Sequence, residues 1–334
     1  MRKYFVLFLV FPILSCHNSS IPDVSKIRVD LKVQRFEKDF FSIDTTKILS
    51  EVEKLRIYYP NFINDFMNQI LGFTSKSSPD SVNKYVSLFI RDYRFVKDSA
   101  DKLFSDLEPE TKEIRKSLQY VKYYFPEYKL PQKIITFIGP FDGYSDVLTS
   151  DALAIGLQLH MGKNFSFYKS EIANDLFPEY ITRKFEPAYI AVNCIKNIID
   201  DLYPDKSAGR GLLEQMVEKG KRLYLMDRLL PGTSDYMKIG YTETQLSDCY
   251  KKEALIWDFF LTNDLLNNSD QNIVKNYIGD SPKTQELGDA SPGNIGSFSG
   301  WQIVKKYMDN NSISIQQLMQ KEPRDIYAVS RYKP

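Results

Sequence analysis

The chain has very few side chains of the kinds that hold a catalytic metal ion. Its 334 residues include two histidines, His17 and His160, and three cysteines, Cys16, Cys194 and Cys249. A catalytic zinc ion is usually held by three side chains, mostly histidines, carboxylates and thiolates. Because His17 adjoins an N-terminal cysteine, the body of the chain retains one histidine. The sequence therefore predicts no metal site, no cofactor and no Ser-His-Asp type of catalysis.

The sequence also lacks a net charge and, beyond its first residues, a long apolar run. It has 44 basic and 43 acidic side chains, which leave a net charge of +1. A surface that binds nucleic acid normally requires a basic excess, so we expect no nucleic-acid partner. No later segment approaches the roughly 18 apolar residues that a membrane-spanning helix needs. With 43% hydrophobic residues, the body can still bury a sizeable core.

The N-terminus has the pattern of a bacterial export signal. A basic dipeptide precedes an apolar segment over residues 4–14, which has the length of a signal peptide and is too short to span a bilayer. The following Ser15-Cys16 resembles the lipobox, in which the cysteine is acylated. We therefore expect a signal peptide over residues 1–15 and a lipidated tether over residues 16–27. The alternative is an ordinary signal peptide with an incidental cysteine.

The residues after Cys16 favour one of the two bacterial membranes as the location of the lipoprotein. Position 17 is His rather than the Asp that retains many lipoproteins in the inner membrane. The segment 17–25 contains one acidic residue, Asp23, and so lacks the acidic run of many surface-exported lipoproteins. We expect the outer membrane, with the domain facing the periplasm.

Hydrophobic periodicity predicts a mainly α protein with a small β-sheet, an α+β fold. Strands are expected over 27–36, 133–139 and 151–161, and the alternation in the third places His160 on a half-exposed face. Helices are expected over 45–71 with an interruption at Pro60, and over 80–104, 109–124, 187–201, 211–229 and 242–261. No repeat or linker follows residue 27, so we expect one domain over 28–334.

Cys194 and Cys249 could pair in an oxidising envelope. Two cysteines alone form no spacing pattern of a disulfide framework, and Cys194 lies in an apolar helical segment. We expect free thiols, although the sequence leaves their pairing open.

The segment SPGNIGSFSGWQIVKKYM, residues 291–308, is rich in glycine and then becomes helical. Ser299 and Gln302 predict a capping box, with Phe298 and Ile303 as a hydrophobic staple. Phosphate-binding loops need a Gly-Lys-Ser/Thr end or a preceding strand, and neither is present. We expect instead that three glycines allow close approach of neighbouring backbones: Gly293, Gly296 and Gly300.

Carboxylates are the remaining candidates for chemistry. Asp142 and Asp146 lie four residues apart in the turn-rich segment PFDGYSD, which lacks the regular ligand alternation of a calcium loop. We expect a solvated turn there, although a carboxylate pair is the alternative. Glu214 and Glu218 lie four residues apart on the helix expected over 211–229, and we expect them on its exposed face.

Longer segments follow the lipobox in order along nearly the entire chain: VQRFEKDFF, YYPNFINDFMNQILG, FIGPFDGYSD, LAIGLQLHMGKNFSFY, FPEYITRKFEP and the glycine-rich segment. In this combination the chain resembles the gliding motility lipoprotein GldB family of the Bacteroidetes. That family is similar in turn to predicted zinc peptidases with His-Glu-x-x-His on one helix and Glu-Gly on a later one. On this mapping Asn193 and Asn197 replace the histidines, Cys194 replaces the general base, and Glu218 is the relic of the third ligand.

The resemblance implies a degenerate zincin-like domain without enzymatic activity. Neutral amides are poor zinc ligands and cannot activate water. The expected function is that of a membrane-anchored lipoprotein required for gliding, whose partners are the membrane and other gliding and type IX secretion proteins. The alternative is a peptidase-like envelope hydrolase that uses carboxylates without zinc, such as Asp142, Asp146 or Glu218.

Overall fold

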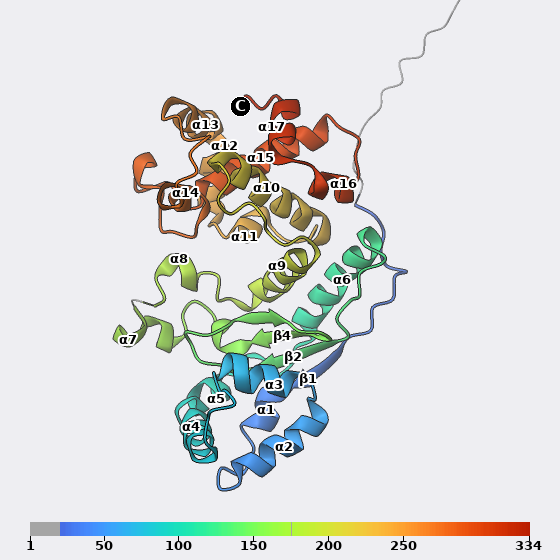
Figure 1. Ribbon diagram of the computed structural model, residues 1–334, viewed down its shortest axis with the longest axis vertical. Helices are drawn as coiled ribbons and strands as arrows, with labels where there is room; N and C mark the ends of the chain where they lie inside the picture. Colours follow the sequence, from blue (N-terminus) through green and yellow to red (C-terminus); the bar gives the residue numbers. More distant parts are fainter. Residues whose placement is uncertain (1–20, 175) are drawn as a thin grey trace, which may run out of the picture.

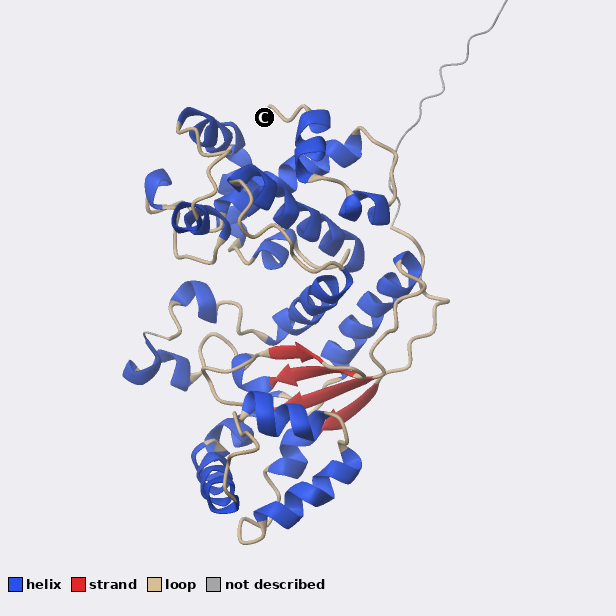
Figure 2. Cartoon of the chain, in the orientation of Figure 1, coloured by secondary structure: helices blue, strands red, loops and turns tan. Residues whose placement is uncertain are grey.

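A four-stranded mixed sheet lies between two groups of helices (Figures 1 and 2). The computed structural model describes residues 21–174 and 176–334, and it confirms the α+β fold. The expected signal peptide and Cys16 lie outside the described residues. Within these two ranges, no helix has both the length and the apolar character needed to cross a membrane.

The sheet has the strand order β1-β2-β4-β3, in which β1, β2 and β4 are parallel and β3 is an antiparallel edge strand. The strands are β1 (Lys32–Arg35), β2 (Lys133–Phe137), β3 (Asp146–Leu148) and β4 (Ala152–Gly156). All five residues of β4 are buried, as is usual for a parallel strand that is covered on both faces.

The strand expected over 151–161 is too long. The chain leaves the sheet after Gly156 and forms a 3-10 turn over Leu157–Leu159. The alternation of apolar residues continues through this turn, but each of its residues is buried. The period-2 pattern was therefore a poor guide to which side chains face solvent.

The helices of the first half pack below and above the sheet in Figure 1. Pro60 separates two of them, as expected. The expected helix over 80–104 divides at Tyr93, whose ring stacks on Phe89 and Phe141. The bounds are α1 (Phe36–Phe40), α2 (Ile48–Tyr58), α3 (Phe62–Asp65) followed by a π-helical turn (Phe66–Ile70), α4 (Pro79–Asp92), α5 (Arg94–Leu103) and α6 (Glu108–Tyr124).

The second half is almost entirely helical. Thr242 and Gln245 form the expected capping box, with reciprocal hydrogen bonds of 3.0 and 3.1 Å, but the expected helix over 242–261 divides at Lys252. The bounds are α7 (Glu171–Asn174), α8 (Glu179–Thr182), α9 (Ile190–Leu202), α10 (Leu212–Leu229), α11 (Asp235–Ile239), α12 (Glu243–Lys251), α13 (Glu253–Thr262), α14 (Gln271–Ile278), α15 (Ile295–Asp309), α16 (Ile315–Gln320) and α17 (Pro323–Ser330).

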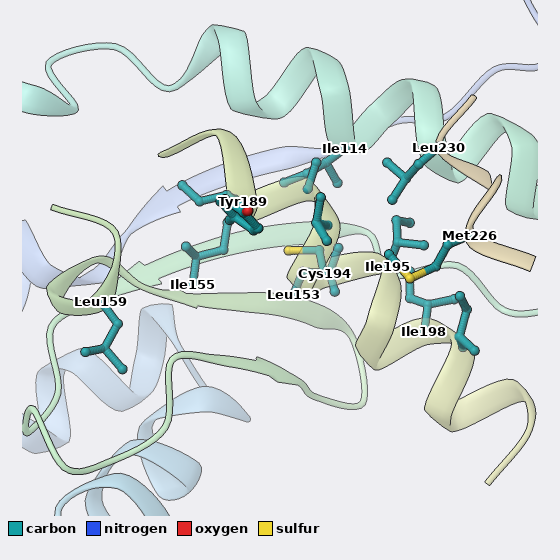
Figure 3. Close-up of a cluster of buried hydrophobic side chains, with 14 of the residues drawn as sticks. Ile114, Leu153, Ile155, Leu159, Tyr189, Cys194, Ile195, Ile198, Met226 and Leu230 are labelled. Atoms are coloured by element: carbon teal, nitrogen blue, oxygen red, sulfur yellow. The ribbon is translucent and has the colours of Figure 1, made fainter. Parts of the chain in front are cut away.

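Helix α9 joins the sheet to the helical upper part. Figure 3 shows its side chains Ile195 and Ile198 in one buried cluster with Leu153 of β4 and Met226 of α10. Ile114 of α6 belongs to the same cluster. This apolar contact fixes the position of α9 relative to the sheet and to α10.

Helices α10 and α15 touch through their backbones, as the glycines led us to expect. A Cβ atom on Gly300 would lie 1.7 Å from the carbonyl oxygen of Met216, and one on Gly220 would lie 2.2 Å from the carbonyl oxygen of Gly300. No side chain larger than hydrogen fits at either position. The glycines therefore set the separation of the two helices.

The expected capping box at Ser299 is wrong. Helix α15 begins at Ile295, and its N-cap is Asn294, so Ser299 is a buried residue inside the helix. Phe298 is likewise inside the helix and cannot act as the first residue of a staple. The Ser-x-x-Gln spacing is a local pattern, and here the helix already begins four residues upstream of Ser299.

Candidate functional site

Four polar side chains from three elements meet at the β3 edge of the sheet. We call Asp146 of β3, His160 of the loop after β4, and Asn193 and Asn197 of α9 the Asp146 cluster. His160 Nε2 lies 3.1 and 3.0 Å from the two carboxylate oxygens of Asp146. Asn193 Nδ2 donates to Asp146 Oδ2 at 3.0 Å, and Asn197 Nδ2 donates to the Asp146 main-chain oxygen at 3.0 Å.

The pair at the centre of the Asp146 cluster is enclosed, while Asn193 and Asn197 are partly exposed. His160 is 0% exposed and the Asp146 side chain is 2% exposed. The half-exposed position expected for His160 is therefore wrong, because the 3-10 turn over Leu157–Leu159 directs the chain inward instead of continuing the strand. The solvated turn expected for PFDGYSD is correct for Asp142, which is exposed, and wrong for Asp146.

The contacts of His160 assign different roles to its two ring nitrogens. An ionised carboxylate only accepts hydrogen bonds, so we assign His160 Nε2 as the donor to Asp146. The other ring nitrogen, Nδ1, is buried and has no hydrogen-bond partner in the described chain. A general base must reach the proton of a nucleophile or a substrate, and burial keeps His160 away from both.

The candidate relic residues lie in three different environments. Asn193 and Asn197 share one face of α9, as their spacing predicts, and both contact Asp146. Cys194 is 1% exposed and lies in the apolar cluster of Figure 3. Glu218 lies on α10, where it pairs with Lys221 at 2.6 Å. Within residues 21–174 and 176–334, no three His, Cys, Asp or Glu side chains gather as a metal-binding group.

The exposed face expected for Glu214 and Glu218 is wrong. The Glu214 residue is 7% exposed and pairs with Arg210 and Arg324, and the Glu218 side chain is 13% exposed. Helix α10 is central, since it contacts α9, α15 and α17. Neighbouring cations offset the cost of burying these two carboxylates. The helical periodicity of the sequence does not show where those cations lie.

Two further buried ion pairs have no local signal in the sequence. Glu37 pairs with Arg35 at 2.6 Å and accepts a hydrogen bond from Thr136 at 2.6 Å; burial raises the pKa of its carboxyl group even so. Asp227 of α10 accepts hydrogen bonds from Lys238 and from the Trp301 indole, each at 2.9 Å. Glu37 and Asp227 each contact side chains of other elements, and neither belongs to the Asp146 cluster.

Both body cysteines are free and buried, so the open question of their pairing is answered in favour of thiols. Burial raises the pKa of Cys194 well above its usual value, and it raises the pKa of Cys249 to about 12. The thiolate is the reactive form of cysteine.

We expect the Cys16→Ala variant, whose remaining thiols are Cys194 and Cys249, to resist iodoacetamide at about pH 8 when native and to gain two adducts in denaturant. Intact mass spectrometry measures this, and rapid alkylation of the native protein would contradict it.

The comparison with known proteins bears on the whole chain. The family model described as gliding motility protein GldB matches residues 17–334. No curated protein and no solved structure matches the chain. Because the family match covers nearly every residue, the chain belongs to the GldB family of gliding motility proteins.

Proposed function

We propose that the protein is a non-enzymatic, membrane-anchored lipoprotein of the gliding machinery. Membership of the GldB family supports the role in gliding. The enclosed pair of Asp146 and His160 carries the non-enzymatic part of the proposal. The Asp146 carboxylate contacts His160 Nε2 and accepts a hydrogen bond from Asn193, and the His160 imidazole is completely buried. In this proposal the cluster joins β3, the loop after β4 and α9, and it has a structural role.

The proposed origin of the Asp146 cluster is a lost metal site in a zincin-like domain over residues 28–334. Asn193 and Asn197 occupy one face of α9 at the spacing of the two metal ligands, next to an antiparallel edge strand. A metal ligand must offer a lone pair to the ion. The amide nitrogens of Asn193 and Asn197 instead donate hydrogen bonds to Asp146. Burial of Cys194 and the ion pair of Glu218 with Lys221 fit the same interpretation.

Among the described residues, no contact favours the alternative of a carboxylate hydrolase. Asp142 is exposed on its loop, Asp146 is enclosed, and Glu218 pairs with Lys221 on α10. These three carboxylates lie in separate environments. Hydrolysis of casein or peptidoglycan by the purified protein, abolished by Glu218→Gln, would overturn the non-enzymatic proposal.

Anchoring through Cys16 is the second part of the proposal. Acyl chains contribute about 0.8 kcal/mol for each buried CH₂, so more than one chain gives stable membrane attachment. The tether over residues 16–27 would hold the domain at the periplasmic face of the outer membrane, where its local concentration near partners is high. The proposed partners are other gliding and type IX secretion proteins, which cross-linking in membranes followed by mass spectrometry would identify.

The Cys16→Ala variant tests the anchor. We expect the variant to move from the membrane fraction to the soluble fraction, because acylation requires the thiol, while its circular dichroism spectrum stays that of a folded α+β protein. Cell fractionation followed by immunoblotting measures the distribution. The Ser19→Ala variant is the matched control and should remain in the membrane fraction. Retention of the Cys16→Ala protein after a carbonate wash would contradict the proposal.

A further inference from the structure

A small pocket of about 200 Å³ lies between α9, α10, α11 and the first turn of α15. Its lining includes cations, two carboxylates and the start of a helix: Lys184, Lys196, Arg222, Lys238, Asp200, Asp280, Asn294 and Ser297. The pocket is separate from the Asp146 cluster, and none of these residues belongs to that cluster. Its volume is below the roughly 300 Å³ at which pockets for larger organic ligands begin.

Lys196 differs from the other cations of the pocket. Lys184 pairs with Asp280, Arg222 with Asp200, and Lys238 with Asp227 and Asp235. In the described part of the chain, the ammonium group of Lys196 has no hydrogen bond and no ion pair. Burial, together with the positive charge of Lys184, lowers the pKa of Lys196 to about 8.

The start of α15 supplies further donors at the pocket. Helix α15 is 15 residues long, and its N-cap residue Asn294 makes no capping hydrogen bond with its side chain. The first backbone N–H groups of a helix have no intrahelical acceptor and carry a partial positive charge. Asn294 and Ser297 bring this helix start to the pocket wall.

We propose that this pocket binds a phosphoryl group, either as free phosphate or as the phosphate of a small organic ester. A phosphoryl group has several acceptor oxygens and a negative charge. These acceptors complement the unpaired ammonium of Lys196 and the start of α15. The volume admits one such group. This inference rests on the pocket alone and is independent of the gliding role.

Isothermal titration calorimetry of the purified full-length protein in detergent tests the proposal. The probes are inorganic phosphate and glycerol phosphate. We expect saturable binding at one site and a loss of at least about tenfold in affinity in Lys196→Met, since one charge-assisted contact is removed. The matched control is Lys275→Met, which replaces an exposed lysine of α14 that has no partner in the described chain. Its affinity should equal that of the unchanged protein.

The Lys196→Met variant should fold, because it replaces a desolvated cation that has no partner with an apolar side chain of similar length. Its melting temperature should be at least that of the unchanged protein, which separates loss of binding from loss of fold. Tighter binding of glycerol phosphate would identify an organic phosphate as the ligand, and tighter binding of inorganic phosphate would identify the free ion. Absence of saturable binding of both probes, or equal affinity in Lys196→Met, would overturn the proposal.

Proton uptake provides a second readout. At about pH 8.5 inorganic phosphate is almost entirely a dianion, and a lysine with a pKa near 8 is mostly neutral. Binding of the anion raises the pKa of this lysine, so we expect the unchanged protein to take up about half a proton or more for each phosphate bound. Titrations in buffers of different ionisation enthalpy measure the uptake. The Lys196→Met protein should take up almost none, and equal uptake in both proteins would overturn the assignment to Lys196.

Discussion

The Gly300→Ala variant is expected to lose about 3 kcal/mol or more of its free energy of unfolding. The new methyl group would lie 1.7 Å from the carbonyl oxygen of Met216, which is a backbone atom of α10 and cannot rotate away. Helices α10 and α15 would have to separate, and buried side chains along both helices would lose contact. Overpacking of a core normally costs roughly 1–3 kcal/mol and more where the backbone must move.

The Gly232→Ala variant is the matched control for this change. No atom lies within 4 Å of a Cβ built at Gly232, and its φ is not positive. We expect its free energy of unfolding to stay within about 0.5 kcal/mol of the unchanged protein. Urea unfolding followed by circular dichroism measures both variants. Equal unfolding midpoints for Gly300→Ala and Gly232→Ala would show that the two helices do not meet as described.

The Asp146→Ala variant is expected to lose about 3 kcal/mol of its free energy of unfolding. Removal of the carboxylate leaves the buried Nε2–H of His160 and the partly buried amide of Asn193 without their acceptor. Each buried group that loses its partner costs roughly 1–3 kcal/mol. Asp142→Ala removes an exposed carboxylate four residues earlier and should change stability by less than about 0.5 kcal/mol.

The Asp146→Asn variant separates a structural role from a catalytic one. Its side-chain oxygen can still accept the proton of His160, while its amide nitrogen faces the donor of Asn193, so we expect a loss of about 1–2 kcal/mol. Cells that carry Asp146→Asn should glide, because the proposed role needs only the fold. Loss of gliding with a normal amount of folded protein would contradict the structural role, and immunoblotting of the same cells measures that amount.

Local features of the fold were predictable because neighbouring residues determine them. The capping box of Thr242 and Gln245 depends on two residues three positions apart, and the interruption at Pro60 depends on the missing amide proton of one residue. The shared face of Asn193 and Asn197 follows from helical geometry alone. These predictions needed no knowledge of what the elements pack against.

Burial was much harder to predict, because it depends on elements that are distant in the chain. A spacing of three residues between a hydroxyl side chain and Gln marks a cap at Thr242 and Gln245, but the same spacing at Ser299 and Gln302 lies inside α15. Glu214 and Glu218 looked like an exposed pair, yet the cations that compensate their burial include Arg324, which lies 110 residues from Glu214.

The sequence alone determined the α+β class, the approximate position of each major helix, the scarcity of metal-binding side chains and the close approach at the glycines. The tertiary structure decided that Asp146 meets His160 and Asn193, that both cysteines are enclosed, and that Lys196 lacks a partner. The physical reason is the range of the interactions. Backbone dihedral preferences and caps act within one turn of the chain, whereas desolvation and charge pairing depend on which surfaces fold against each other.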